Sequence, residues 1–179
     1  KRDGTLFNKF LAFPEDYSGG VSMATADFDR DGLDEIVVVA SAGVSPMVKI
    51  FRPDGVLISS FRALPTSFKS GLELAVGDLN GDGWTEIITI PVDGLPQIRV
   101  WNWLGKELRP AFFLTPKGAR GINLSAGDVD NDGKAELIVG SPRGREPVVK
   151  IYNMNLKLLK EFLAYPKNEK VGVKVTVVE

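Results

Sequence analysis

The stretch Asp27-Phe28-Asp29-Arg30-Asp31-Gly32-Leu33-Asp34-Glu35 is the most informative part of this chain. It places carboxylates at positions 1, 3, 5 and 9 and a glycine at position 6, and an apolar run, residues 36–40, follows at once. Hard divalent cations such as Ca²⁺ bind several oxygen ligands at about 2.3–2.6 Å, and a tight loop with alternating acids supplies them. Gly32 permits a sharp turn that a residue with a Cβ would resist.

The same pattern occurs twice more, at residues 78–86 and 128–136. The first aspartates of the three copies are separated by 51 and 50 residues. Clusters of Asp, Asn and Gly are common in ordinary turns, so a single copy could be either a turn or a metal loop. A turn has no need of a fixed period. Three regularly spaced copies therefore favour three metal-binding loops.

The composition excludes several kinds of chemistry. The 179 residues fit one domain or part of a longer repeat domain, and 44% hydrophobic with 25% charged residues is typical of a globular chain. The absence of Cys and His removes disulfides, thiolate catalysis, His-based triads and the commonest transition-metal ligand. No apolar run reaches the roughly 18 residues of a membrane span, so we expect no membrane insertion of this segment. The start shows no signal-peptide pattern, as is also true of a mature secreted segment.

The charge is unevenly distributed. The three loops hold 12 of the 23 acids and 2 of the 22 bases, a sum of −10, so the remainder carries +9 and the whole chain −1. Three bound Ca²⁺ would bring the formal charge to about +5. The surplus bases are typical of a solvated surface, with attraction to an anionic polymer as the alternative. They are scattered and the sequence pI is about 5.7, so no nucleic-acid partner is expected.

Each acidic loop belongs to a repeating unit of about 50 residues. An alternating segment precedes it, as in Val21, Met23 and Thr25, and period-two alternation predicts a strand. A continuous apolar run follows, which suits a strand buried on both faces. Then come a third strand, a compact turn and a fourth strand. We find no amphipathic helix, since the best candidate, residues 156–163, aligns with the fourth strands. The apolar runs and third strands are 36–39, 48–51, 87–90, 98–101, 137–139 and 149–152.

The predicted fold is all-β, built from β-propeller blades of four antiparallel strands. A β-sandwich is the alternative, but its strands rarely carry the same loop at a fixed period. The predicted boundaries are a last strand of a preceding blade at 1–14, blades at 20–65, 71–116 and 121–166, and a first strand of a further blade at 171–179. Ring closure takes about 4–8 blades. We therefore expect further blades, either from the same longer chain or from a second chain.

With these motifs, the sequence resembles the FG-GAP/VCBS-type repeats of bacterial secreted proteins, which are related to the blades of the integrin α-subunit propeller. The resemblance rests on the Asp-x-Asp-x-Asp-Gly-x-x-Glu loop before an apolar strand and on Val48-Lys49-Ile50-Phe51 with its two counterparts. It implies that each loop joins the first and second strands of a blade and holds Ca²⁺, about three ions in all. Asn80 departs from the all-acid pattern and leaves the second site one charge fewer. The implied side-chain ligands are Asp27, Asp29, Asp31, Glu35, Asp78, Asn80, Asp82, Glu86, Asp128, Asp130, Asp132 and Glu136, and the implied carbonyl ligands are those of Leu33, Trp84 and Lys134.

The EF-hand is the competing calcium motif. It requires flanking helices and a bidentate Glu at position 12. Position 12 is Val38, Thr89 or Val139 here, and the flanking segments are predicted as strands. The sequence therefore excludes the EF-hand.

The function expected from these features is that of a non-enzymatic, calcium-binding module of a secreted or cell-surface protein. It would mediate adhesion or interaction with a protein or glycan ligand, in extracellular fluid where sites with affinities of about 10⁻⁴–10⁻³ M stay filled. One alternative is the propeller domain of a polysaccharide lyase or hydrolase that uses paired carboxylates. The other is a lectin with aromatic platforms. Its candidates are Trp84, Trp103 and Tyr17, whereas Trp101 aligns with Phe51 and Tyr152 and is expected in the core. The acids outside the loops, which show no paired spacing, are Glu15, Asp16, Glu73, Asp93, Glu107, Glu146, Glu161 and Glu169.

Overall fold

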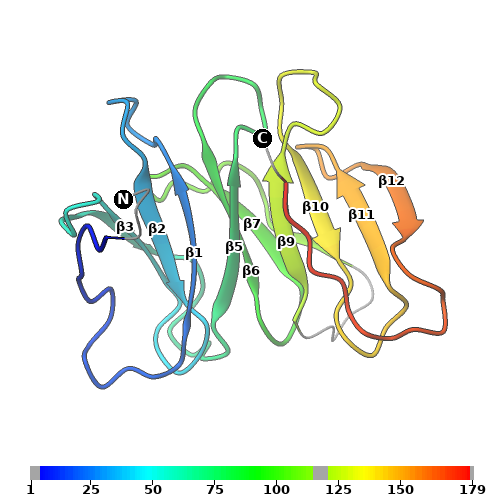
Figure 1. The fold of residues 1–179 in the computed structure, drawn as a ribbon, viewed down its shortest axis with the longest axis horizontal. Coiled ribbons are helices and arrows are strands. Elements are labelled where there is room, and N and C mark those ends of the chain that lie inside the picture. Colours follow the sequence, from blue (N-terminus) through cyan, green and yellow to red (C-terminus); the bar gives the residue numbers. More distant parts are fainter. Residues whose placement is uncertain (1–4, 115–120, 178–179) are drawn as a thin grey trace.

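A computed structural model describes residues 5–114 and 121–177, and these form three antiparallel sheets without a helix (Figure 1). Within these ranges, nothing helical is therefore available to cross a membrane. Each sheet has four strands in sequence order, which confirms the all-β blade architecture. The first sheet consists of β1 (Val21–Ala26), β2 (Glu35–Ala40), β3 (Met47–Phe51) and β4 (Leu57–Arg62). The second consists of β5 (Leu72–Gly77), β6 (Glu86–Pro91), β7 (Gln97–Trp101) and β8 (Phe112–Phe113). The third consists of β9 (Asn123–Gly127), β10 (Glu136–Gly140), β11 (Val148–Tyr152) and β12 (Leu158–Leu163).

The second strand of each sheet is its most buried element, as the continuous apolar runs predict. In β2 the side chains of Val37 and Val39 are fully buried, and Val38 is 4% exposed. β1 pairs with β2 along its whole length, from Val21 opposite Ala40 to Ala26 opposite Glu35. This register places the end of β1 beside the start of β2, so the acidic loop between them closes tightly.

The hydrophobic cores lie between blades. β1, β5 and β9 run side by side, and the three sheets fan out behind them (Figure 1). One core combines Val37 and Ile50 of the first sheet with Leu72 and Ile87 of the second. Another joins the second sheet to the third in the same way. No blade buries its faces alone, which is the packing logic of repeat proteins.

The fourth strand of the second blade is much shorter than predicted. β8 has two residues, whereas β4 and β12 have six each. Pro110 lies in the middle of this segment and has no N–H to donate to β7. The chain between the paired residues of the third and fourth strands is also one residue longer here than in the first blade. Ile98 pairs with Phe112 in the second blade, whereas the equivalent pair in the first blade is Val48 and Phe61. The mismatch in length and the proline together leave only an isolated bridge from Trp101 to Glu107 and the short β8.

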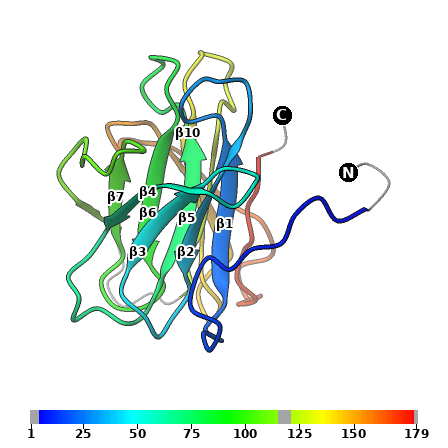
Figure 2. The same cartoon turned by 90° about the vertical axis from the view of Figure 1, so that its left-hand side faces the viewer.

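The strand expected at residues 1–14 does not form among its described members, residues 5–14. This segment nevertheless occupies the place of a fourth strand beside the first sheet and runs outside it (Figure 2). The ring of Phe10 lies 5.0 Å from that of Phe51, and Nζ of Lys49 donates a hydrogen bond of 2.7 Å to the carbonyl of Ala12. A β-strand forms only where a neighbouring strand pairs with it through backbone hydrogen bonds, and no described strand pairs with this segment.

The strand expected at residues 171–179 is also not formed over its described part, residues 171–177. The segment is extended, and Val173, Val175 and Val177 pack against Ile138, Val149 and Ile151 of the third sheet. In Figure 1 it runs in red beside β9, the position that β9 itself holds relative to β5. The alternating valines therefore face the sheet as in a first strand, but no described strand pairs with this segment through backbone hydrogen bonds. Residues 178 and 179, like 1–4 and 115–120 of the predicted boundaries, lie outside the described residues.

Candidate metal centres

The three acidic loops each join the first and second strands of a blade and lie together at the upper edge of Figure 1. Because the three blades repeat one geometry, every loop starts at the end of an inner strand and finishes in a buried strand. The loops also touch one another. The backbone N–H of Ala135 in the third loop donates a hydrogen bond of 2.7 Å to the carbonyl of Asp78 in the second.

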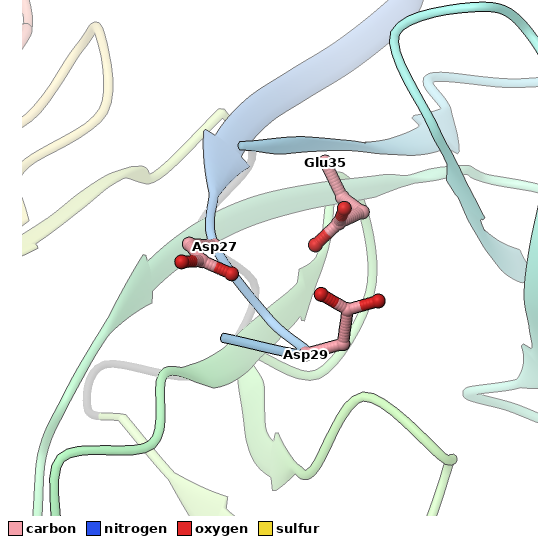
Figure 3. Close-up of side chains that lie close together, drawn as sticks. All are labelled: Asp27, Asp29 and Glu35. Carbon is pink, nitrogen blue, oxygen red and sulfur yellow. The ribbon is translucent and has the colours of Figure 1, made fainter. Parts of the chain in front are cut away.

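Each loop brings three carboxylates together. In the first loop, Asp27, Asp29 and Glu35 each offer an oxygen, and these oxygens lie within 4.8 Å of one another. Figure 3 shows the three side chains pointing toward a common centre. A separation of this size fits one cation with several oxygen ligands at about 2.3–2.6 Å. The groups in the other loops are Asp78, Asp82 and Glu86, and Asp128, Asp130 and Glu136.

The glutamate at position 9 is buried in all three loops. Glu35, Glu86 and Glu136 are 1%, 2% and 3% exposed. One oxygen of each accepts a hydrogen bond from the backbone N–H at position 2 of its own loop, at 2.9, 2.8 and 3.1 Å. The other oxygen of Glu35, Oε1, is buried without a hydrogen-bond partner. A buried polar atom without a partner costs free energy, and a cation at the centre of the loop would remove that cost.

The electrostatics of the loops oppose ionisation of these glutamates. Burial is the main cause that raises the pKa of Glu35 and Glu136, and the neighbouring aspartates raise it further. Burial and the charges of Asp82 and Asp78 raise the pKa of Glu86 to about 7. A divalent cation at the centre of each loop would favour the ionised form of its glutamate and so lower the raised pKa.

The aspartates also shape the loop backbone. Oδ2 of Asp27 accepts a hydrogen bond from the N–H of Gly32 at 3.0 Å, and Oδ1 of Asp31 accepts one from Leu33 at 2.8 Å. The other two loops repeat both contacts. Asp31 and Asp132 do not belong to the clusters of three carboxylates described above. In the first and third loops the structure therefore brings together only part of the predicted ligand set. Ligation by these two aspartates and by the carbonyls of Leu33, Trp84 and Lys134 stays a prediction.

The loop backbone has a left-handed residue at position 4 as well as at position 6. Gly32, Gly83 and Gly133 at position 6 have φ of 88°, 80° and 86°. Position 4 has φ of 63° at Arg30, 77° at Gly81 and 61° at Asn131. Sequence reasoning found the first position through its glycines and missed the second. Gly81 and Asn131 favour this conformation and were the available signal, whereas Arg30 obscured it.

Asn80 gives the second loop a different local network. Its amide nitrogen donates hydrogen bonds of 2.9 Å to Asp82 and 3.0 Å to Glu86. A neutral donor thus lies among the carboxylates where the other two loops have Asp29 or Asp130. The amide oxygen of Asn80 accepts a hydrogen bond from the N–H of Asp82 at 2.7 Å.

The aromatic candidates for a glycan platform differ in exposure. Trp101 is 6% exposed, and its indole N–H donates a hydrogen bond of 3.0 Å to Thr89, so it belongs to the core. Trp103 is partly buried against the core between the first two blades. The hydroxyl of Tyr17 lies 2.6 Å from the carbonyl of Gly20, which ties this ring to the loop before β1. Trp84 is 42% exposed, with the guanidinium of Arg30 over its ring.

Several of the acids outside the loops have cationic or polar partners. Glu107 pairs with Arg99 at 3.0 Å, and Glu146 and Glu161 pair with lysines at 3.2 Å. Glu73 accepts a hydrogen bond of 3.0 Å from Ser22 of the first blade. The three ion pairs are partly exposed to solvent, and the contact of Glu73 with Ser22 links the second blade to the first.

Comparison with known proteins agrees with this geometry. Residues 78–139, which contain the second and third acidic loops, match the family model of the FG-GAP-like repeat. The solved structure of the exotype rhamnogalacturonan lyase YesX is similar to this chain, with a TM-score of 0.59 and 15% sequence identity. The similarity covers 83% of this chain and 34% of that one, so this chain spans about one third of the lyase's length. The comparison with curated proteins found no match.

These findings define a β-propeller-type repeat module. The resemblance to FG-GAP-type repeats is confirmed by the match over residues 78–139. At 15% identity, the likeness to the lyase establishes the fold alone.

Proposed function

We propose that this chain is a calcium-binding module of a secreted or cell-surface protein, in which each acidic loop holds one Ca²⁺. The observation that carries the proposal is the buried glutamate of each loop, above all Glu35, whose Oε1 has no partner beside Asp27 and Asp29. An ordinary Asx turn does not require a buried carboxylate, so the burial of these glutamates favours a metal loop over a simple turn. The all-oxygen donor set is that of a hard cation.

The module is proposed to be non-enzymatic and to act as a scaffold for binding a protein or a glycan. Extracellular calcium would keep sites with affinities of about 10⁻⁴–10⁻³ M filled, which supports a location outside the cell. Further blades, from the same chain or a second chain, are proposed to pack on the outer faces of the array. Phe162 supports this at the third blade, because it is 44% exposed, whereas the equivalent Phe61 and Phe112 are partly buried against the next blade.

Melting in EDTA and in Ca²⁺ tests the metal proposal. A ligand that binds only the folded state at 100 times its Kd stabilises that state by about 2.7 kcal/mol per site. For a chain of this size, 1 kcal/mol shifts the melting temperature by about 2–4 °C. We expect EDTA to lower the melting temperature by several degrees and excess Ca²⁺ to restore it. Identical melting curves in the two buffers would contradict the proposal.

A second candidate is the propeller part of an extracellular enzyme that acts on polysaccharides. The fold similarity to a rhamnogalacturonan lyase favours testing it. An assay of this chain on pectic and other acidic polysaccharides in millimolar Ca²⁺ separates the two functions. Reproducible depolymerisation, lost when two acids outside the loops are replaced, would favour the enzyme. Retention on an immobilised polysaccharide without depolymerisation would favour the binding module.

A further inference from the structure

The side chain of Arg30 crosses from the first acidic loop to the second. Its Nε donates a hydrogen bond of 3.1 Å to the carbonyl of Gly83, and Nη2 donates one of 3.1 Å to the carbonyl of Asp82. The guanidinium carbon lies 4.0 Å from the ring centroid of Trp84. One side chain therefore holds three consecutive residues of the neighbouring loop.

The second loop is the richest of the three in glycine. Asp82 lies between Gly81 and Gly83, both with positive φ, so this loop has glycine at positions 4 and 6. The first and third loops have Arg30 and Asn131 at position 4 instead. Glycines lose the most conformational freedom on ordering, so binding a cation here costs the second loop the most. Contacts that order residues 82–84 in advance would reduce this cost.

The orientation of Arg30 depends in turn on the first loop. Arg30 has a φ of 63°, a conformation unfavourable for a residue with a Cβ. The next N–H, of Asp31, donates hydrogen bonds of 3.2 Å to both Asp27 and Asp29, two of the three grouped carboxylates. The groups that would hold a cation in the first loop therefore also hold the backbone from which Arg30 extends.

Between the second and third loops, no side chain extends from position 4 to the next loop. Position 4 of the second loop is Gly81, and a Cβ there would lie 3.0 Å from the side chain of Lys134 at position 7 of the third loop. Position 4 therefore faces position 7 of the next loop at both interfaces. At the first interface the cationic side chain extends from position 4 and donates hydrogen bonds to the backbone of the next loop, whereas at the second Lys134 extends from position 7 over Gly81.

We infer that Arg30 couples the first and second metal centres, so that a cation in the first loop raises the affinity of the second. Arg30 is a positioning residue, because it holds loop backbone and ligates no ion itself. The inference rests on the proposed metal binding. Coupling between sites is reciprocal, so a cation in the second loop should raise the affinity of the first by the same factor.

Terbium luminescence sensitised by tryptophan tests this coupling, with Tb³⁺ as the probe in place of Ca²⁺. Trp84 lies on the second loop, so excitation of its indole reports occupancy there. The variant Trp84→Phe, which keeps the backbone carbonyl, should abolish that signal and so identify its source. Tb³⁺ affinity is then measured in wild type, in Asp27→Asn/Asp29→Asn, in Arg30→Ala and in the triple variant.

We expect the double aspartate variant and Arg30→Ala each to weaken Tb³⁺ binding at the second loop about fivefold. The triple variant should be no weaker than either, because both changes break the same link. Arg30→Lys should resemble Arg30→Ala, since a lysine has no planar fork for two carbonyls. Arg62→Ala, which removes an exposed arginine that pairs with Met47 at the end of the first sheet opposite the acidic loops, should have no effect.

Two outcomes would overturn the inference, and they are distinguishable. Tb³⁺ binding near Trp84 that is unaffected by Arg30→Ala, or effects that multiply in the triple variant, would remove the coupling and leave the metal centres intact. No Tb³⁺ binding by the folded wild type would remove both the coupling and the proposed function. Circular dichroism of each variant establishes that it is folded.

Discussion

The ring of Phe61 on β4 lies 5.2 Å from the ring of Trp101 on β7, so the outer edge of the first blade packs on the third strand of the second. Phe10 and Phe51, at 5.0 Å, and Phe112 and Tyr152, at 6.3 Å, repeat this contact at the other two interfaces. Each third-strand aromatic, at position 51, 101 or 152, therefore packs against an aromatic ring from the segment that precedes its own blade. The same aromatic pair recurs at every described contact of this kind.

The first prediction concerns this pair. Phe61→Ala should lower the free energy of unfolding by about 2 kcal/mol, because it removes a partly buried ring packed against Trp101. Phe162→Ala is the matched control, since Phe162 has the equivalent place on β12 but is 44% exposed. Its effect should stay within about 0.5 kcal/mol. Urea denaturation measures both, and equal losses would argue against the pairing as the source of stability.

The second prediction concerns the buried glutamate of the first loop. Glu35→Gln removes a charge that has no counterion in the metal-free protein, so we expect the variant to be more stable than wild type in EDTA, by about 1 kcal/mol. The same change should reduce the stabilisation by Ca²⁺, because an ionised ligand is lost. Glu169→Gln, at an exposed position, should alter neither quantity. A variant that gains nothing in EDTA would show that burial of the Glu35 charge carries no such cost.

The third prediction concerns pH. Burial raises the pKa of Glu86 to about 7 from an ordinary value of 4.5, so the folded metal-free protein binds this proton more tightly than the unfolded chain does. The linked stabilisation is fully present below pH 4.5 and is lost as the pH rises through about 7. Urea denaturation in EDTA should follow this decline, and Glu86→Gln should flatten it. Calcium affinity should rise over the same interval, because binding displaces the proton.

The fourth prediction concerns the glycine at the entry to the second blade. Gly71 has a φ of 79°, and a Cβ there would lie 1.9 Å from the carbonyl oxygen of Ser41. Gly71→Ala should therefore displace the first blade from the second and cost more than about 3 kcal/mol. Gly43→Ala is the control, because its φ is 84° but nothing lies within 4 Å. Strain alone should make it cost about 1–2 kcal/mol, and thermal unfolding distinguishes the two.

The fifth prediction concerns Asn80. Asn80→Asp gives the second loop the acid that the other loops have at this position. We expect about tenfold tighter Ca²⁺ binding at that loop, since affinity follows the charge of the ligands. Stability in EDTA should fall, because the amide donor to Glu86 is replaced by a fourth negative charge. Asn168→Asp adds the same charge at an exposed turn, and calorimetric titration should find its affinities unchanged.

Much of this architecture could be predicted from local patterns. The alternating inner strands, the buried second strands and the loop between them each depend on neighbours within a few residues. The segment 156–163 was predicted as strand from its place in the repeat, and β12 (Leu158–Leu163) confirms it. The grouping of Asp27, Asp29 and Glu35 also follows from spacing, because Glu35 begins the strand that pairs back onto β1.

The sequence by itself determined the repeat, the strand order and the acidic loops, since these arise from periodic side chains and turn residues close along the chain. Only the tertiary structure decided which extended segments become strands. Residues 5–14 and 171–177 have no strand to pair with among the described residues, and the fourth strand of the second blade is shortened at Pro110. The tertiary structure also brings Arg30 onto the second loop, 52 residues away, through the packing of adjacent blades. Such contacts depend on the relative positions of whole sheets, and no local pattern encodes them.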